Sequence, residues 1–186
     1  MILKEVISYA SREPREDEVE GREHYFISVD DAEKMIKEQD VKIKTNINGV
    51  IYFSTDEEIR SKNTYKIDPI GLKRFKEEYS DLNIKTIYIH CPRIIRQNRT
   101  LESRGSSYEF EKRDESESQQ FDMFEADAKF DYKIENINLK ESVAELMLFI
   151  NNNPADMYCI VGRTGSGKDT IIKETNKVLE KLNRNN

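Results

Sequence analysis

A glycine-rich segment near the end of the chain has the residue types and spacing of a phosphate-binding loop. Gly162, Gly165, Gly167 and Lys168 fit the spacing G-x-x-x-x-G-K, between a short apolar stretch and a helical pattern. In such a turn, backbone N–H groups and a helix N-terminus point at one phosphate, and the lysine adds positive charge. A chance glycine turn is the alternative, and the apolar stretch before it and the helical pattern after it make that alternative unfavourable.

The residue after the lysine departs from the pattern. A serine or threonine normally follows the lysine and holds magnesium, whereas this chain has Asp169, followed by Thr170. A carboxylate beside a triphosphate is tolerable if it faces the metal or its water shell, or if it turns away and Thr170 replaces it. Asp169 is therefore the candidate metal ligand.

A second cluster of charged residues lies near the start of the chain, between residues 8 and 26. Arg12 and Arg15 flank Pro14, and the guanidinium fork of arginine matches the oxygens of a phosphate. Runs of mixed charge are usually solvated surface, so this segment alone does not identify a site.

Short apolar stretches alternate with helical patterns along the chain, which predicts an α/β fold with a mostly parallel sheet and flanking helices. Between residues 25 and 54 the pattern changes to short polar pieces, which indicates an inserted, antiparallel subdomain. Residues 151–156, NNNPAD, are the clearest linker. The expected strands are residues 3–8, 64–67, 86–90, 132–135 and 157–161. The expected helices are residues 29–38, 69–79, 92–102, 109–128, 140–151 and 170–182, the last burying Ile171, Ile172, Val178 and Leu182.

Bulk composition favours a soluble single domain of 186 residues. The net charge of −6 gives no bulk attraction to nucleic acid or to an anionic membrane, and no apolar run approaches the length of a membrane span. The N-terminal residues are unlike a signal peptide, so we expect a cytoplasmic protein. Cys91 and Cys159 lie in expected buried strands, which favours reduced core residues over a disulfide. The sequence does not indicate the oligomeric state.

The position of the loop is unusual, because loops of this type normally open their domain and here only residues 169–186 follow. The segment from Ser8 fits S-x-x-[ST]-R-x-P-R-x-x-E-x-x-G, which resembles the monophosphate-binding segment of guanylate kinases. INGVIYFST, KIDPIG, LESRG and EKR follow in the order of that family's further motifs. The sequence therefore resembles a circularly permuted guanylate kinase, with residues 151–156 joining the family's old ends. This implies a P-loop NTPase-type fold in one domain, residues 1–186.

The resemblance implies a role for each matching residue. The phosphate loop would bind ATP together with Mg²⁺, and Lys168, Arg104 and Arg113 would act on the transferring phosphoryl group. Arg99 lies one place from a further family arginine, and Thr100 fills that place. The ATP-binding residues would be Gly162, Arg163, Thr164, Gly165, Ser166, Gly167, Lys168, Asp169 and Thr170. The monophosphate-binding residues would be Ser8, Arg12, Arg15, His24, Tyr52, Ser54 and Asp68.

Two positions depart from the family at the acceptor site. His24 stands where the family has a phosphate-binding tyrosine, and it could equally be a surface side chain. Ile43 replaces a glutamate that reads guanine, so that only Asp68 remains to accept from the N–H groups of the base. Lys66 also replaces an acidic residue near the metal.

The resemblance implies a nucleoside monophosphate kinase that transfers the ATP γ-phosphoryl group to GMP or dGMP, with other deoxynucleotides as further candidates. Residues 9–62 would bind the monophosphate, residues 99–118 would form a lid, and residues 157–186 would form the permuted phosphate-loop unit. A non-catalytic module that binds a phosphorylated partner is the second hypothesis, although such modules typically lack the loop. An unrelated P-loop ATPase is the third, and it leaves the arginine segment unexplained.

Overall fold

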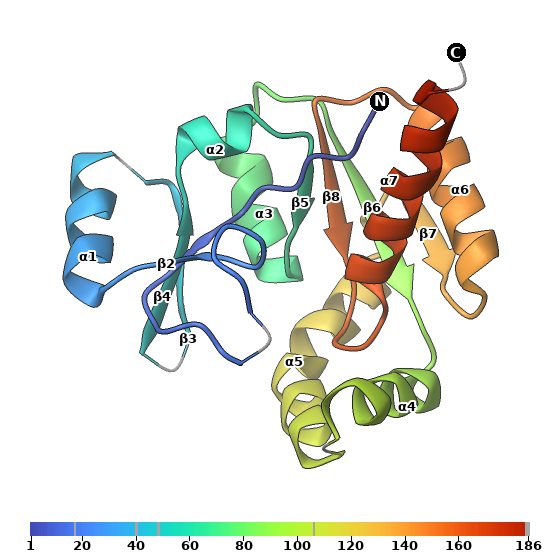
Figure 1. Ribbon diagram of the computed structural model, residues 1–186, viewed down its shortest axis with the longest axis horizontal. Helices are drawn as coiled ribbons and strands as arrows, with labels where there is room; N and C mark the ends of the chain where they lie inside the picture. Colours follow the sequence, from blue (N-terminus) through green and yellow to red (C-terminus); the bar gives the residue numbers. More distant parts are fainter. Residues whose placement is uncertain (17, 40, 48, 106, 185–186) are drawn as a thin grey trace.

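Two four-stranded sheets organise the residues that this computed structural model describes, namely 1–16, 18–39, 41–47, 49–105 and 107–184 (Figure 1). The larger sheet has the strand order β5-β8-β6-β7, and every neighbouring pair in it is parallel. Its strands are β5 (Thr64–Lys66), β6 (Ile84–His90), β7 (Tyr132–Glu135) and β8 (Met157–Val161). The prediction of a parallel α/β sheet is confirmed.

Strand β8 lies inside this sheet, between β5 and β6, and all of its residues are buried. Its side chains alternate between two apolar clusters, as the two faces of a strand require. Cys159 and its two alternate neighbours pack with α3 and α5, whereas Tyr158 and Ile160 pack with α6 and α7. These four helices are α3 (Pro69–Glu78), α5 (Ser107–Asp127), α6 (Leu139–Asn152) and α7 (Lys168–Arg184).

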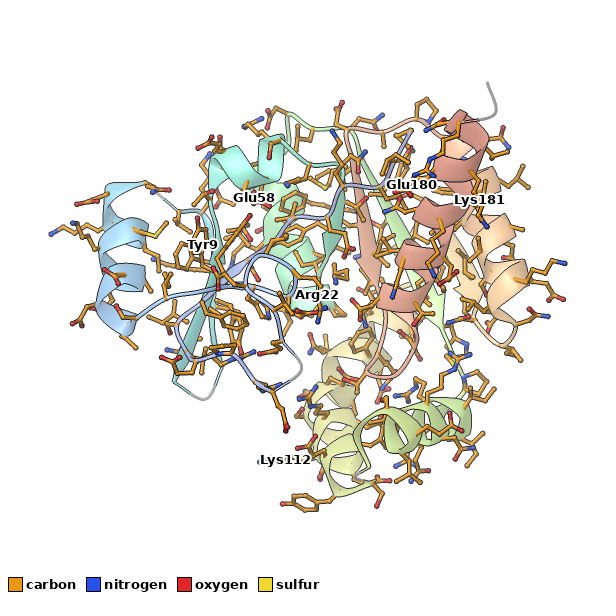
Figure 2. All side chains as sticks on the ribbon, in the orientation of Figure 1. Tyr9, Arg22, Glu58, Lys112, Glu180 and Lys181 are labelled. Atoms are coloured by element: carbon orange, nitrogen blue, oxygen red, sulfur yellow. The ribbon has the colours of Figure 1, made fainter. Side chains whose placement is uncertain are left out.

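The smaller sheet has the strand order β2-β1-β4-β3 and carries α1 against one face. Strand β4 pairs antiparallel with both β1 and β3, whereas β1 and β2 are parallel. The expectation of an inserted antiparallel subdomain is therefore confirmed for most of the pairings. Its elements are β1 (Tyr9–Ala10), β2 (Tyr25–Phe26), α1 (Val29–Glu38), β3 (Ile43–Ile47) and β4 (Val50–Ser54), followed by α2 (Asp56–Arg60). Figure 2 shows Tyr9 among the side chains of this sheet.

The expectation of a continuous strand over residues 3–8 is wrong. The segment runs beside β5 but forms a single isolated bridge, between Glu5 and Thr64. The N–H of Lys4 lies on the same side as that of Val6, which donates to the Thr64 carbonyl, but it donates instead to Asn63 Oδ1 at 2.7 Å. The ladder therefore does not extend from this bridge towards the start of the chain.

The buried face of α7 also differs from the expectation. Ile171 and Ile172 are buried as expected, but Val178 and Leu182 are exposed. The buried stripe continues through Thr175 and Leu179, which follow Ile171 at intervals of one helical turn. Because Thr175 is polar, the pattern of apolar residues alone did not predict this buried face.

The start of the chain lies beside α7. Asn176 Oδ1 accepts from the backbone N–H of Leu3 at 2.8 Å, and Asn176 Nδ2 donates to the Leu3 carbonyl at 2.8 Å. Figure 1 places Met1 near the last turns of α7, and Figure 2 labels Glu180 and Lys181 there. We expected Asn186 to emerge at the same surface, and Asn186 lies outside the described residues.

Residues 153–156 form a short turn that is held against the start of β6. Asn83 Nδ2 donates to the Pro154 carbonyl at 3.1 Å, and the backbone N–H of Asn83 donates to Asp156 Oδ2 at 2.8 Å.

Cys91 and Cys159 are buried and free, as expected. Among the described helices, none is both long and apolar enough to cross a bilayer.

Candidate active site

The glycine-rich loop follows the buried strand β8 and leads directly into α7. Gly165 and Gly167 have φ angles of 75° and 88°, in the left-handed region that favours glycine. A side chain at Gly167 would also place its Cβ 2.5 Å from Asn136 Nδ2. The loop therefore needs glycine for both conformation and space, and its N–H groups converge at the start of a helix, where an anion is stabilised.

Lys168 is the first residue of α7 and is half-buried, which corrects our expectation of an exposed loop side chain. Its ammonium group donates to the Gly162 carbonyl, and to the Arg163 carbonyl at 3.2 Å. Desolvation lowers the pKa of Lys168. The side chain thus lies folded over its own loop, where phosphates would bind.

Asn136 supports the loop from β7, a role that the sequence analysis missed. Its Nδ2 donates to the Ser166 carbonyl at 2.6 Å, and its own carbonyl accepts from Arg99 Nη2 at 3.0 Å. Thr100 is buried and its hydroxyl donates to the Arg96 carbonyl, so neither Arg99 nor Thr100 extends into solvent. Its position immediately after the expected strand at residues 132–135 was the available signal for Asn136.

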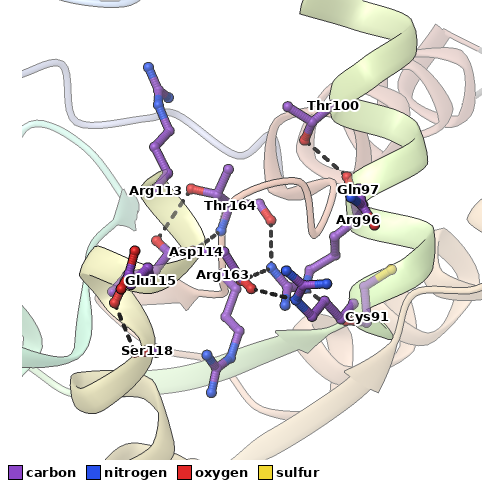
Figure 3. A network of polar contacts seen from close by, with 12 residues as sticks. Cys91, Arg96, Gln97, Thr100, Arg113, Asp114, Glu115, Ser118, Arg163 and Thr164 are labelled. Carbon is purple, nitrogen blue, oxygen red and sulfur yellow. Dashed lines mark hydrogen bonds and ion pairs between the residues drawn. The ribbon is translucent and has the colours of Figure 1, made fainter. Parts of the chain in front are cut away.

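The helix pair α4 (Arg93–Arg104) and α5 contacts the loop through a network of charged groups (Figure 3). Arg96 Nη1 donates to Asp114 at 2.6 Å and to the Thr164 carbonyl at 3.1 Å. Arg163 pairs with Asp122 at 2.6 Å and with Glu125 at 3.0 Å, both on α5. The helix pair is therefore joined to the loop by contacts of Arg96, Asp122 and Glu125, which flank the predicted lid of residues 99–118.

Glu117 of α5 contacts a backbone group that phosphate could use. Its carboxylate accepts from the Thr164 N–H at 2.6 Å and lies 3.3 Å from the Thr164 hydroxyl. No sequence motif pointed to this residue. A carboxylate thus occupies one N–H group of the phosphate loop, where it satisfies a donor that an anion would otherwise take.

Of the two arginines predicted for the lid, only Arg113 has a side chain within the described part of the structure. Arg113 lies on α5 and is half-buried, and Figure 3 shows its side chain pointing away from Arg96. Arg104 is the last residue of α4, and its side chain lies outside the part of the chain that the structure describes.

A cavity of about 370 Å³ lies between the smaller sheet, α3 and α5. Ser8, Tyr52 and Asp68, three of the predicted monophosphate-binding residues, line it together with Ile43. Asp68 is the N-cap of α3 and accepts from the Gly71 N–H at 2.9 Å. Ser54 is fully buried, with its hydroxyl 3.1 Å from that of Tyr65, and it is not among the described residues that line the cavity.

The remaining predicted acceptor residues surround Tyr52. Arg12 Nε donates to the Tyr52 hydroxyl at 3.2 Å, and the His24 ring centroid is 5.4 Å from that of Tyr52. Burial, followed by the charge of Arg12, lowers the pKa of His24, so its ring is neutral near pH 7. Its Nδ1 is 2.9 Å from the Ser8 hydroxyl, which lines the cavity.

Glu18 holds the arginine segment in place. Arg12 pairs with its carboxylate at 2.6 Å, and the backbone N–H of Arg15 donates to it at 2.9 Å. The hydrogen bonds from Arg12 lower the pKa of Glu18 to about 2, so the pair is charged at neutral pH. The side chain of Arg15 is exposed.

Lys66 connects the acceptor cavity with the start of α7. It lines the cavity, and its Nζ lies 2.5 Å from Asp169 Oδ1 and 2.8 Å from Glu5 Oε2. Asp169 is 79% exposed, and Thr170 beside it is also exposed. Within the described residues, no group of three or more His, Cys, Asp or Glu side chains gathers as a metal site.

Comparisons with known proteins agree with this geometry. The family model described as guanylate kinase matches residues 3–153 of the chain. A guanylate kinase of Bdellovibrio bacteriovorus is 28% identical over 156 residues, which cover 81% of this chain and 83% of that protein. A guanylate kinase of Geobacter metallireducens is 29% identical, covering 77% and 72%.

A solved structure, that of guanylate kinase from Anaplasma phagocytophilum, shares the fold. Its TM-score is 0.56 at 16% identity, and the match covers 81% of this chain and 75% of that one. The residues that the family model matches end before β8, so the glycine-rich loop and α7 lie beyond the matched part.

Proposed function

Because the chain belongs to the guanylate kinase family, we propose that it transfers the γ-phosphoryl group of ATP to GMP or dGMP. One observation carries the proposal beyond family membership. Lys66 lines the acceptor cavity and contacts Asp169 at the start of α7, so the cavity and the phosphate loop are adjacent. In-line phosphoryl transfer requires this adjacency, because catalysis depends mainly on positioning two anions and stabilising their charge.

The phosphate loop and Lys168 bind the β- and γ-phosphates of ATP in this proposal. The loop leads into the N-terminus of α7, where an anion is stabilised, and the ammonium group of Lys168 lies over the same loop. Phosphate binding requires Lys168 to leave the Gly162 carbonyl, which a charge-assisted contact with phosphate favours.

The acceptor monophosphate lies against Arg12, Arg15 and Tyr52. Arg12 and Tyr52 already contact each other, and the exposed side chain of Arg15 extends from the same segment. Neutral His24 offers a hydrogen bond beside them rather than a charge. The base then occupies the cavity lined by Ser8, with Ser54 supporting its wall through Tyr65, and Asp68 accepts from guanine.

We assign residues 9–62 to acceptor binding, residues 99–118 to a lid and residues 157–186 to the phosphate-loop unit. Gly105 separates α4 from α5 within the lid and has a φ of 69°, which marks a helix end there. Arg104 and Arg113 flank this end, and closure of the lid brings positive charge towards the transferring group and excludes water.

Magnesium fits the exposed start of α7. Asp169 and Thr170 supply oxygen atoms there, and a magnesium ion that is bound largely by phosphates and water needs only one or two protein ligands. When bound there, the ion would supply positive charge that stabilises the phosphates of ATP. Asp169 would hold it while its other side faces Lys66.

A coupled assay of ADP release, with each nucleoside and deoxynucleoside monophosphate offered in turn, tests the proposal. We expect ADP release that requires both ATP and GMP or dGMP. ADP release without an acceptor would instead indicate an ATPase. Binding of GMP with no ADP release would indicate a non-catalytic module that recognises a phosphorylated partner.

We also propose that the chain is circularly permuted relative to its family. The family match lacks residues 154–186, yet β8 lies between β5 and β6 and leads into the phosphate loop. The start of the chain contacts α7 through Asn176, as expected where a family loop has been opened. The turn at residues 153–156 would then join the family's former ends.

Replacing Asp169 by Ser should lower activity less than tenfold and leave it dependent on Mg²⁺. The serine hydroxyl remains a magnesium ligand at this position, and Lys66 keeps Glu5 as a partner. Steady-state rates measured over a magnesium titration, with a chelator as the zero point, check the expectation. Activity that persists in chelator would contradict a metal role at the start of α7.

Replacing Glu117 by Ala should tighten the binding of an ATP analogue about threefold to tenfold, because one hydrogen bond of the empty state no longer has to be broken. Removing the negative charge of Glu117 from beside the triphosphate should also tighten the binding of the analogue. Calorimetry with a non-hydrolysable ATP analogue measures the effect. Glu115→Ala, an exposed carboxylate on the same helix, is the matched control.

Weaker analogue binding by Glu117→Ala would contradict this expectation. It would mean that the carboxylate holds the loop in its binding conformation.

The buried, free cysteines fit a reducing compartment, so our proposal retains a cytoplasmic location.

A further inference from the structure

Lys66 occupies the junction between the acceptor cavity and the phosphate loop. It is the last residue of β5, lines the cavity and is half-buried. Asp169, its closest ionic partner, directly follows Lys168 at the start of α7, where the loop N–H groups converge. The Lys66 ammonium group therefore lies between the two nucleotide sites, where phosphate passes from one nucleotide to the other.

The partners of Lys66 leave part of its ammonium group available. An ammonium group has three N–H donors. Asp169 accepts one at 2.5 Å, and Glu5 Oε2 lies 2.8 Å from the same nitrogen, close enough to occupy a second. One donor therefore remains for an oxygen atom that enters from the cavity.

Two carboxylates hold the ammonium group at this position. Asp169 and Glu5 lie 2.5 and 2.8 Å from Lys66 Nζ and come from two different parts of the chain. An ammonium group beside an anion-binding loop attracts phosphate, and Coulomb interactions are strong where water is partly excluded. The two carboxylates fix its position before any nucleotide binds.

We infer that Lys66 is a catalytic residue that donates a hydrogen bond to the transferring phosphoryl group. This inference rests on the proposed kinase function and adds a second lysine to the site. Asp169 and Glu5 position the ammonium group, and its remaining N–H meets phosphate oxygens as negative charge spreads over them during transfer. Lys168 approaches the same phosphates from the loop side, so the two lysines act from different elements.

Lys66→Met tests the inference, because it removes the charge and keeps the length of the side chain. We expect kcat with ATP and GMP to fall about 100-fold, as when one transition-state donor is removed, with less than about a threefold change in either KM. Lys66→Arg should recover at least about tenfold of the loss, since a cation returns. Lys62→Met is the matched control, a similarly accessible lysine that pairs with Glu58 and is not among the described residues lining the cavity.

Thermal unfolding of each variant separates structural damage from loss of chemistry. A kcat for Lys66→Met equal to that of Lys62→Met would overturn the inference. It would also fail if only the KM for GMP rose, or if Lys66→Arg showed no recovery while folding as the wild type does. Wild-type protein that releases no ADP with any monophosphate would refute the proposed function itself, which is a separate outcome.

Discussion

Lys168→Ala is expected to lower kcat about 10²- to 10³-fold, the usual loss when one preorganised donor to a transition-state charge is removed. The lysine ends the loop, and its ammonium group already lies over it, in contact with the Gly162 and Arg163 carbonyls. Among the described lysines, no other donates to the loop carbonyls, although Arg96 also donates to one of them, that of Thr164.

The structural cost of the same change should be small but measurable. An exposed loop lysine would be lost with little effect on stability, whereas Lys168 is half-buried and satisfies two carbonyl groups. Loss of such contacts costs about 1–3 kcal/mol at most if the carbonyls remain buried, and less if water reaches them. Thermal unfolding of the variant measures this cost independently of activity.

Lys173→Ala is the matched control for Lys168→Ala, because Lys173 is an exposed lysine on the same helix. It should leave both kcat and the binding of an ATP analogue unchanged. Turnover by Lys168→Ala close to that of the wild type, in protein that unfolds at a similar temperature, would show that residues 162–168 do not form the ATP-binding loop.

The features that the sequence predicted correctly are local in the chain. A buried strand, a glycine turn and a helix follow each other over residues 157–184, and each leaves its own signal within a few residues. The same holds for most strands and helices of the larger sheet. The complete burial of β8 and the start of α7 needed no long-range information.

The errors arise where side chains from distant parts of the chain compete for backbone groups. The segment at residues 3–8 has the composition of a strand, but it forms a single bridge to β5, and the side chains of Asn63, Glu58 and Asn176 accept from other N–H groups of the segment. These partners are distant in sequence, so neither composition nor periodicity reports them. The exposed Val178 illustrates a related limit, because buried Thr175 shifts the true face of α7.

The candidate site also combines features that are local in the sequence with contacts between residues that are far apart in it. Gly165, Gly167 and Lys168 are recognisable from spacing, whereas Asn136 and Glu117 act on the loop from elements that are 30 and 47 residues away. The contact between Lys66 and Asp169 spans 103 residues. Each of these two residues is an isolated departure from the family pattern in the sequence, and only the fold shows that they form an ion pair.

Removal of residues 154–186 should prevent folding altogether, even though the family match lies wholly outside this segment. The truncation deletes β8, whose five buried residues separate β5 from β6, and α7, which covers one face of the sheet. Each large buried apolar side chain contributes about 1.5–3 kcal/mol, so their sum exceeds the 5–15 kcal/mol that stabilises a typical domain. Circular dichroism and sedimentation of residues 1–153 should show an unfolded or aggregated chain.

A re-permuted chain, with its segments rejoined in a different order, is the companion experiment to this truncation. It begins at Ala155, runs to residue 186, continues through a short Gly/Ser linker to Met1 and ends at Pro154, which is the order that our proposal of a permuted chain assigns to the family. Leu3 contacts Asn176, about 12 Å along α7 from Arg184, so a linker of about six residues spans the distance. The contacts of β8 and of the phosphate loop are unchanged in this order, and we therefore expect cooperative unfolding and kcat within about threefold of the parent chain. A soluble, folded 1–153 fragment would show that β8 is dispensable, and an inactive or unfolded re-permuted chain would show that the ends are not the two halves of one opened loop.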